Sequence, residues 1–409
     1  MTFFVAILGL IFLIAIHEAG HFYIARAVGM RPRKYSVGFG PALLRLRRGE
    51  AEYVLGAIPL GGYVDIPGWF PPTSKDFRTG VAPLLRAAPE LTSTVAQIEV
   101  ALDAGEEAEA RTLLAELQER AEQVPLSRAE RWSVDRSLRE VSGALLPHAY
   151  WRQPLWKRLS VVMAGPVANI LVAFLIFFVV YLVGAPTGSA SSEVAAVESN
   201  TPAAAAGLEP GDRIVAVNGH ATPTFDSVSR RIRASDGREI TVTVRRDGRT
   251  VTLGPRRTIR SGDRWIWGFQ PSVAVVTYPP WSAARRAVAD CWQVVTGTAE
   301  AIGNLFHGQE RGQLTSAVGI VRVSAAVLKV SVAWYLQIVG LVSMSLAILN
   351  LLPLLPLDGG RVLFGIVEGI RRRAVAREVY ERVSVVGVAI MLMIAVIALS
   401  NDLSGAGPR

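Results

Sequence analysis

The sequence predicts an α-helical membrane protein with four transmembrane helices, a small membrane-associated β-hairpin sheet and one compact extracytoplasmic α+β domain. Hydrophobic residues make up 51% of the 409 positions, and the mean hydropathy is +0.34. This is too apolar for an ordinary soluble protein. Four long apolar stretches each have about the length needed to cross a hydrocarbon core roughly 30 Å thick. They are the run that starts at Met1 and residues 161–184, 332–355 and 383–400.

The charge of the chain is interpreted as a sign of membrane topology. The formal net charge is +9, but the arginines are scattered and no nucleic-acid recognition motif accompanies them. Nucleic acid is therefore not an expected partner. The loop between the third and fourth spans is rich in arginine, whereas no charged residue precedes the first span. The positive-inside rule then places this loop in the cytoplasm and both termini outside.

The first half of the chain is expected to contain three segments. Residues 1–69 hold the first transmembrane helix, which ends near Gly29 and Pro32, and a membrane-associated hairpin over residues 34–66. Residues 70–150 are rich in Ala, Glu, Arg and Leu and form a cytoplasmic insert. A solvated helical hairpin is the favoured interpretation of this insert, and a regulatory or partner-docking module is the alternative. Residues 151–187 form the second transmembrane helix, with the small-residue stretch AGPVAN, Ala164–Asn169.

Three further segments complete the expected organisation. Residues 188–275 form the compact extracytoplasmic domain. Residues 276–330 form an interfacial amphipathic segment with Trp281, Trp292 and Phe306. Residues 331–409 form the third and fourth transmembrane helices, and Pro353 and Pro356 must end the third one. The single cysteine, Cys291, excludes an intrachain disulfide.

The first span contains a motif for metal chemistry, HEAGH. His17 and His21 are four residues apart, so a helix presents both imidazoles on one face, where they can bind one zinc ion. In the His-Glu-x-x-His arrangement of metalloproteases, the glutamate, here Glu18, takes a proton from a water molecule whose pKa zinc lowers to about 7. Ionisable groups inside a membrane are costly and usually functional. The alternative is that these side chains snorkel or hydrogen-bond neighbouring helices, which does not explain two histidines at metal-binding spacing.

A third protein ligand is expected, because catalytic zinc sites usually have three. The candidate is Asp358, which follows the double-proline break and precedes Gly359 and Gly360. On its own, Asp-Gly-Gly is more typical of a turn. Together with the histidine motif inside the membrane, it favours a metal ligand.

The sequence resembles the bacterial site-2 proteases, which are intramembrane zinc metalloproteases of regulated intramembrane proteolysis. The motifs that carry the resemblance are HEAGH, IPLGGYV, AGPVAN and NLLPLLPLDGG, in that order, with a PDZ-like domain between the second and third spans. The resemblance implies that His17, His21 and Asp358 bind Zn²⁺ and that Glu18 is the general base. It also implies that Asn350 helps to hold the substrate backbone, although an interhelical hydrogen-bonding role is the alternative for this residue.

The resemblance also suggests how a substrate is held and which substrates are cut. Gly61, Gly62 and Tyr63 would belong to a membrane-reentrant β-loop that binds an unwound segment by strand addition; an ordinary membrane-dipping turn is the alternative. The PDZ-like domain would act as a size filter, bind chain ends or serve as a spacer. Expected partners are membrane lipid, single-span proteins such as anti-sigma factors or remnant signal peptides, and an upstream protease that cuts first.

Two other classes of function remain open. A catalytically silent membrane adaptor would bind clients through the PDZ-like domain, but it would have no need of Glu18. A zinc carrier would need a chain of polar residues leading onward through the other spans, and the sequence shows one metal constellation only.

Overall fold

The computed structural model describes residues 1–262, 264–306 and 316–404. It contains two compact units. One comprises Met1–Leu175, Val288–Ala326 and Ile338–Arg409, and the other comprises Ile176–Ala287 and Val327–Gln337. Residues 307–315 of the predicted segment 276–330, and the side chain of Phe306, lie outside the described part of the chain.

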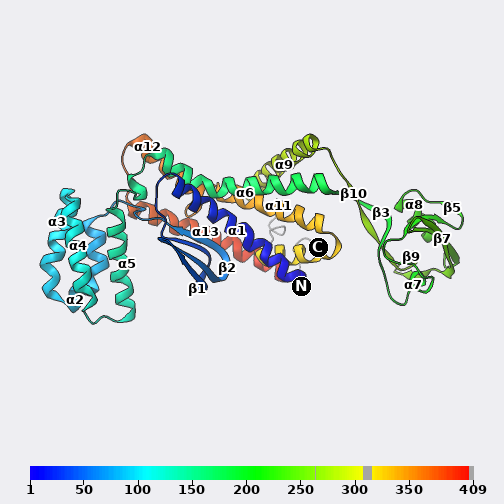
Figure 1. Ribbon diagram of the computed structural model, residues 1–409, viewed down its shortest axis with the longest axis horizontal. Helices are drawn as coiled ribbons and strands as arrows, with labels where there is room; N and C mark the ends of the chain where they lie inside the picture. The colour runs from blue at the N-terminus through cyan, green and yellow to red at the C-terminus, as the bar shows by residue number, and fades with distance from the viewer. Residues whose placement is uncertain (263, 307–315, 405–409) are drawn as a thin grey trace. The chain divides into compact units, whose positions relative to one another are not determined.

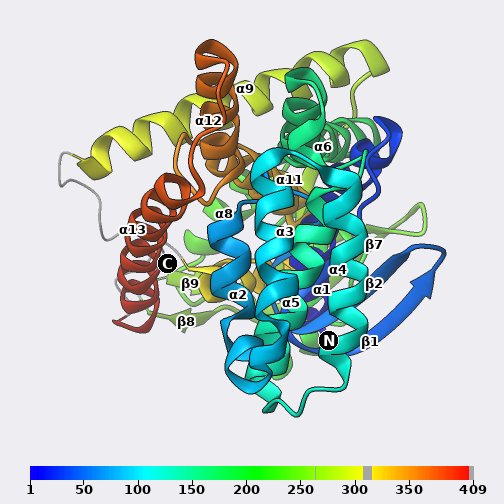
Figure 2. The ribbon, with the colours of Figure 1, turned by 90° about the vertical axis from the view of Figure 1, so that its left-hand side faces the viewer.

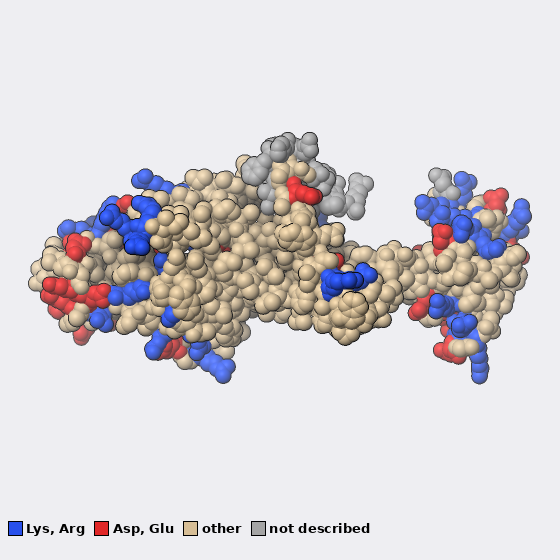
Figure 3. All heavy atoms as spheres, turned by 90° about the horizontal axis from the view of Figure 1, so that it is seen from above, with Lys and Arg blue, Asp and Glu red and all other residues tan. Residues whose placement is uncertain are grey.

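Within that described part, four helices are long and apolar enough to cross a membrane. They are α1 (Thr2–Ala27), α6 (Leu155–Val183), α11 (Val332–Asn350) and α13 (Arg377–Ser404). They correspond to the four stretches that hydropathy predicts, with differences at their ends. α6 and α13 begin before their apolar runs, because a more polar first turn continues each helix. α11 ends before its apolar run does, because Pro353 follows closely. Few charged side chains appear over these helices in Figure 3, whereas basic and acidic side chains are both frequent over the helical bundle described below.

A β-ribbon lies alongside α1 and forms the predicted hairpin (Figure 1). It consists of β1 (Lys34–Arg48) and β2 (Ala51–Asp65), joined by a turn at Gly49 and Glu50. β2 bends so that its two ends flank the start of β1, since Tyr35 of β1 is paired with both Tyr53 and Val64. The last part of β2, including Tyr63, is therefore an edge of the sheet. The ribbon is fixed to α1 by the Tyr35 hydroxyl, which donates to the Ala15 carbonyl at 2.7 Å.

The insert between the ribbon and α6 is larger than the expected helical hairpin. It contains four helices that lie side by side in Figure 2: α2 (Ser74–Ala87), α3 (Thr92–Ala104), α4 (Glu107–Glu122) and α5 (Arg128–Ala144). Short 3₁₀ turns, Pro89–Leu91 and Tyr150–Arg152, accompany them. All four helices contribute buried side chains to one apolar core, with Phe77, Ile98, Leu117 and Val134 fully buried. The insert is therefore a small bundle with its own core.

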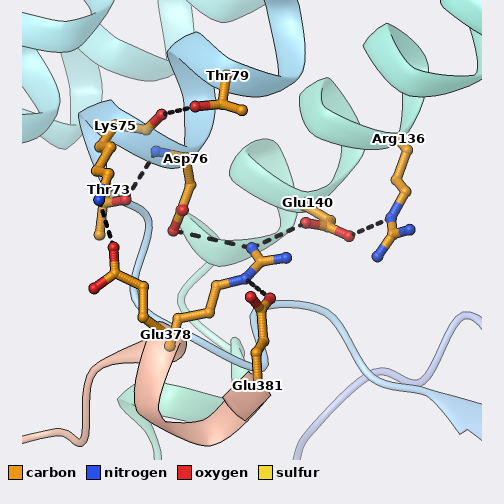
Figure 4. Close-up of polar contacts among 9 residues, drawn as sticks. Thr73, Lys75, Asp76, Thr79, Arg136, Glu140, Glu378 and Glu381 are labelled. Atoms are coloured by element: carbon orange, nitrogen blue, oxygen red, sulfur yellow. Dashed lines mark hydrogen bonds and ion pairs between the residues drawn. The ribbon is translucent and has the colours of Figure 1, made fainter. Parts of the chain in front are cut away.

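Ion pairs join this bundle to the first turns of α13 (Figure 4). Arg377 lies among three acids, with nitrogen–oxygen distances of 2.8 Å to Glu381, 3.4 Å to Glu140 and 4.0 Å to Asp76. Lys75 of α2 also pairs with Glu378 of α13. Charged groups on both sides thus attach the bundle to the start of an apolar helix.

The second unit contains a mixed α+β fold. Its six-stranded sheet has the order β10-β3-β4-β6-β7, with β5 paired to β4. The strands are β3 (Ala185–Val197), β4 (Arg213–Val217), β5 (His220–Ala221), β6 (Glu239–Arg246), β7 (Arg249–Arg257) and β10 (Phe269–Val276), and β8 (Ile259–Ser261) and β9 (Arg264–Ile266) form a separate pair. Helices α7 (Pro202–Ala205) and α8 (Phe225–Arg233) complete the unit. Trp267 and Val228 are among the buried core residues.

Three other helices lie outside the bundle and the sheet. α9 (Pro280–Phe306) and α10 (Ala317–Val330) occupy the predicted interfacial segment, and Trp281 and Trp292 are exposed on α9. α12 (Asp358–Arg371) follows the proline-rich break after α11 and begins with the proposed third metal ligand.

Candidate active site

His17 and His21 lie one turn apart on α1 and are both buried, with 7% and 8% exposure. Their Nε2 atoms are 3.2 Å apart, and the two rings meet edge to face with centroids 4.8 Å apart. Asp358 brings a carboxylate to the same point: its Oδ2 is 3.1 Å from Nε2 of His17 and 3.3 Å from Nε2 of His21. The structure thus brings together three potential ligand atoms from two segments of the chain that are more than three hundred positions apart.

The spacing of these three atoms fits zinc. Ligands about 2.0 to 2.1 Å from a tetrahedral zinc ion are separated from one another by roughly 3.3 Å. The three observed distances are 3.1, 3.2 and 3.3 Å. Two imidazole nitrogens and one carboxylate oxygen also form a donor set typical of catalytic zinc, with a fourth position left for water or substrate.

The break between α11 and α12 brings Asp358 to the histidines. α11 ends at Asn350, and α12 starts at Asp358 itself. Gly359 and Gly360 follow, and a Cβ atom on either would overlap backbone atoms of residues 351–355. Only glycine allows the chain to fold back so closely here.

The helix α6 contributes no ligand but orients both imidazoles. Nδ1 of His21 donates to the Val161 carbonyl at 2.8 Å, so Nε2 keeps its lone pair for a metal. The amide of Asn169 lies 3.3 Å from Nδ1 of His17. This amide is fully buried, and its Oδ1 has no hydrogen-bond partner among the described residues. A half-turn of the amide, which exchanges its oxygen and nitrogen, places an acceptor on Nδ1–H of His17.

Small residues allow α6 to approach α1 closely, as the AGPVAN stretch predicts. A Cβ atom on Gly20 of α1 would overlap the Ala164 carbonyl, and one on Gly165 of α6 would overlap Nε2 of His21. The prediction of close helix approach is confirmed. Gly165 also leaves room for the imidazoles of His17 and His21, which a side chain at this position would overlap.

A cavity of about 180 Å³ opens onto the three ligand atoms. Glu18, which is 8% exposed, lines it, and so do Gly62, Tyr63 and Asn350. The amide nitrogen of Asn350 donates to the Leu346 carbonyl of its own helix at 3.0 Å. Gly61 lies against the ring of Phe39 and is not among the residues that line this cavity. The structure therefore brings together every predicted site residue except Gly61.

Sequence reasoning missed Asn169 as a residue that contacts the site, although the AGPVAN stretch contains it. A signal was present, because a polar amide within an apolar helix needs a hydrogen-bond partner. Asn169 also follows Gly165 by four residues, which places both on one face of α6. The sequence did not show that this face is turned toward His17.

Comparisons with known proteins agree with this geometry. The family model described as peptidase family M50 matches residues 5–394. A relative from Agrobacterium fabrum whose name describes a zinc metalloprotease is 31% identical, over 97% of this chain and 94% of its own length. A similarly named relative from Mesorhizobium japonicum is 30% identical over 95% of each chain. The zinc metalloprotease RasP of Geobacillus kaustophilus is 27% identical over 96% of this chain and 95% of its own length.

Proposed function

The chain belongs to peptidase family M50 and is a site-2-type intramembrane zinc metalloprotease, and we propose that it cuts the transmembrane segments of single-span membrane proteins. Anti-sigma-factor-like proteins and remnant signal peptides are the proposed substrates, after a first cut by another protease. The observation that carries this proposal is the meeting of His17, His21 and Asp358 beside a buried glutamate in one cavity.

Four polar residues of the cavity have a proposed role in the chemistry of peptide hydrolysis. His17, His21 and Asp358 hold zinc, which when bound polarises a peptide carbonyl and lowers the pKa of a coordinated water. Glu18 takes a proton from the attacking water and later donates it to the leaving nitrogen. Burial of the Glu18 carboxylate keeps bulk water from competing for this proton.

The substrate must be unwound, because a helical peptide bond has its carbonyl hydrogen-bonded to the next turn. The proposed docking site is the edge of the β-ribbon at Gly62 and Tyr63, which pairs with an extended segment by strand addition. Gly62 supports this role, because a Cβ atom there would lie 2.6 Å from Cγ of Glu18, so the ribbon runs directly past the proposed base. Gly61 would provide backbone freedom next to this edge, with φ of +154°. Asn350, which also lines the cavity, would contact the substrate backbone.

The proposed topology places four spans in a bacterial inner membrane with both termini outside. The loop between α12 and α13 is then cytoplasmic, and residues 188–275, which contain most of the six-stranded sheet, form an extracytoplasmic PDZ-like domain that screens substrates. Reporter fusions test this arrangement. A fusion after Gly369 should report the cytoplasm, and one after Gly237 the exterior; the reverse pattern would overturn the topology.

The decisive experiment compares the wild-type protein with Glu18→Gln, each co-expressed with a tagged single-span membrane protein. Glu18→Gln should abolish cleavage and keep its zinc, because the glutamine cannot accept the proton but the three ligands are unchanged. His17→Ala should lose both zinc and cleavage. Equal cleavage by wild type and Glu18→Gln would refute the assigned base. A silent adaptor, by contrast, would bind the tagged protein and cleave it in neither form.

A further inference from the structure

A second cavity, of about 390 Å³, lies next to the active-site cavity. It is bounded by the start of α6, by α12, by the first turns of α13 and by residues 69–71 and 150–151. Trp69 and Arg361 line both cavities and separate them. The proposed chemistry of peptide hydrolysis uses none of the other residues of the second cavity.

The walls of this cavity are strongly basic. Arg158, Arg361, Arg372 and Arg373 line it, and Glu368 is the acid among the lining residues. Glu368 is engaged, because it pairs with Arg158 at 2.8 Å. Two of the four arginines, Arg372 and Arg373, face the cavity without an ion-pair partner among the described residues. For Arg361, the nearest carboxylate is Asp358, at 3.7 Å.

The deepest arginines keep unused hydrogen-bond donors. The Nε atoms of Arg158 and Arg361 are buried and have no hydrogen-bond partner among the described residues. The guanidinium of Arg361 lies over the ring of Trp69 at 4.9 Å, and that of Arg158 lies over Tyr150 at 5.9 Å. Aromatic faces thus hold each guanidinium, and buried donors without partners are costly unless a ligand accepts from them.

The surroundings of the cavity indicate the boundary between hydrocarbon and headgroups. On α12, Ile366 and Ile370 are exposed and lie on a different face from Gly365 and Gly369, which contact α6. Three arginines, Arg371 to Arg373, follow Ile370 directly, as expected where a helix leaves the hydrocarbon. Trp156, in the first turns of α6, is also exposed, and tryptophan is enriched at membrane interfaces.

We propose that this basic cavity binds a phosphate group, supplied by the headgroup of an anionic phospholipid. Guanidinium groups bind phosphate oxygens through paired N–H donors, and basic pockets between membrane helices recognise anionic headgroups. The volume accommodates a phosphate with its glycerol. Because Arg361 borders both cavities, the bound headgroup would lie next to the carboxylate of Asp358 without entering the active site. The proposal does not depend on the assigned catalytic roles.

The test measures lipid binding to the purified full-length chain in a neutral detergent. Phosphatidylglycerol is titrated at constant ionic strength and bound molecules are counted by native mass spectrometry, with inorganic phosphate in a parallel titration. The variant is Arg372→Gln with Arg373→Gln, which removes the rim of the cavity and leaves the active site intact. The matched control is Arg371→Gln with Arg382→Gln, two exposed arginines of the same region that are not among the residues lining the cavity.

The rim variant should bind phosphatidylglycerol roughly 30-fold more weakly than wild type, about fivefold for each arginine. The control pair should stay within about twofold of wild type. Binding of phosphatidylglycerol alone would support a lipid as the source, and displacement of it by inorganic phosphate would support a phosphate site that is open to soluble anions. Equal binding by wild type and the rim variant, or an equal loss in the control pair, would overturn the proposal.

Discussion

Replacing Asn169 by leucine tests whether α6 orients the metal site. Leucine has nearly the same volume and shape but has no acceptor for Nδ1–H of His17. Since Asn169 is fully buried, water cannot easily replace the lost acceptor. The His17 ring would then lose the contact that fixes its tautomer and orientation, although it remains in place as a ligand.

The expected loss is in zinc affinity. Removing a residue that orients a metal-binding histidine typically costs 10- to 100-fold in affinity, which corresponds to about 1.4 to 2.7 kcal/mol. We expect the upper half of this range for Asn169→Leu, because the contact is buried and is the hydrogen bond that the structure gives to Nδ1 of His17. Asn169→Asp should retain most of the affinity, because a carboxylate also accepts from Nδ1–H.

The assay is competition for zinc between the purified protein and a chromogenic chelator. Ser343→Ala is the matched control: its hydroxyl donates to the backbone carbonyl of Asn169 at 2.8 Å, so it tests helix packing at the same position without touching the amide. The control should keep wild-type zinc affinity. Wild-type affinity in Asn169→Leu, measured alongside a His17→Ala protein that has lost its zinc, would refute the role of the amide. That result would leave the protease assignment unaffected.

Two further predictions concern packing and charge. Gly165→Ala should abolish zinc binding, since its methyl group would overlap Nε2 of His21. Gly297→Ala, at a glycine with open space around it, should leave zinc binding unchanged. The zinc content of each variant after dialysis tests both expectations. Asp212→Ala should destabilise the second unit by about 2 kcal/mol, because Asp212 is 1% exposed and accepts two hydrogen bonds from Arg246, each 2.7 Å long, while Arg246 keeps Glu209 as a partner at 2.9 Å. Burial raises the pKa of Asp212, but the hydrogen bonds from Arg246 outweigh it and lower the pKa. The stabilisation by Asp212 should therefore be complete above about pH 4 and decline as the pH falls through the lowered pKa. Amide hydrogen exchange in β6 measures this stability. Equal exchange protection in the wild type and in Asp212→Ala would contradict the prediction.

The apolar helices and the histidine pair could be predicted because each depends on local sequence alone. Length and hydropathy locate helices such as α1, and helical spacing places His17 and His21 on one face. The contact of Asp358 with the two histidines could not be predicted from residue spacing alone. It could be anticipated because zinc sites usually have a third protein ligand and the resemblance to site-2 proteases implied Asp358, whereas the start of a helix at Asp358 was not predicted.

The bundle in the insert could not be predicted to the same degree. Proline at positions 83 and 89 interrupts the helical pattern of this region, so only the later, alanine-rich part showed clear helical periodicity. In the structure, Pro83 lies inside α2, and the second proline starts a short 3₁₀ turn before α3. Packing of all four helices around a shared core compensates for these interruptions. Pairwise contacts of this kind, like the one between Asn169 and His17, depend on which helix faces are turned toward each other, and one sequence does not show this.

The contacts of α6 explain why a helix without a ligand lies at the centre of the site. Its Val161 carbonyl and its Asn169 amide contact the two imidazoles on α1. Its first turns contact α12, because a Cβ atom on Gly369 would lie 2.5 Å from a methyl group of Leu155. α12 carries the third ligand at its first residue, so α6 touches every element that supplies a ligand. A shift of α6 would therefore change the orientation of both rings and the position of the carboxylate together. For this reason, substitutions at the start of α6, far from the ligands in sequence, should reduce zinc affinity even when α1 is unchanged.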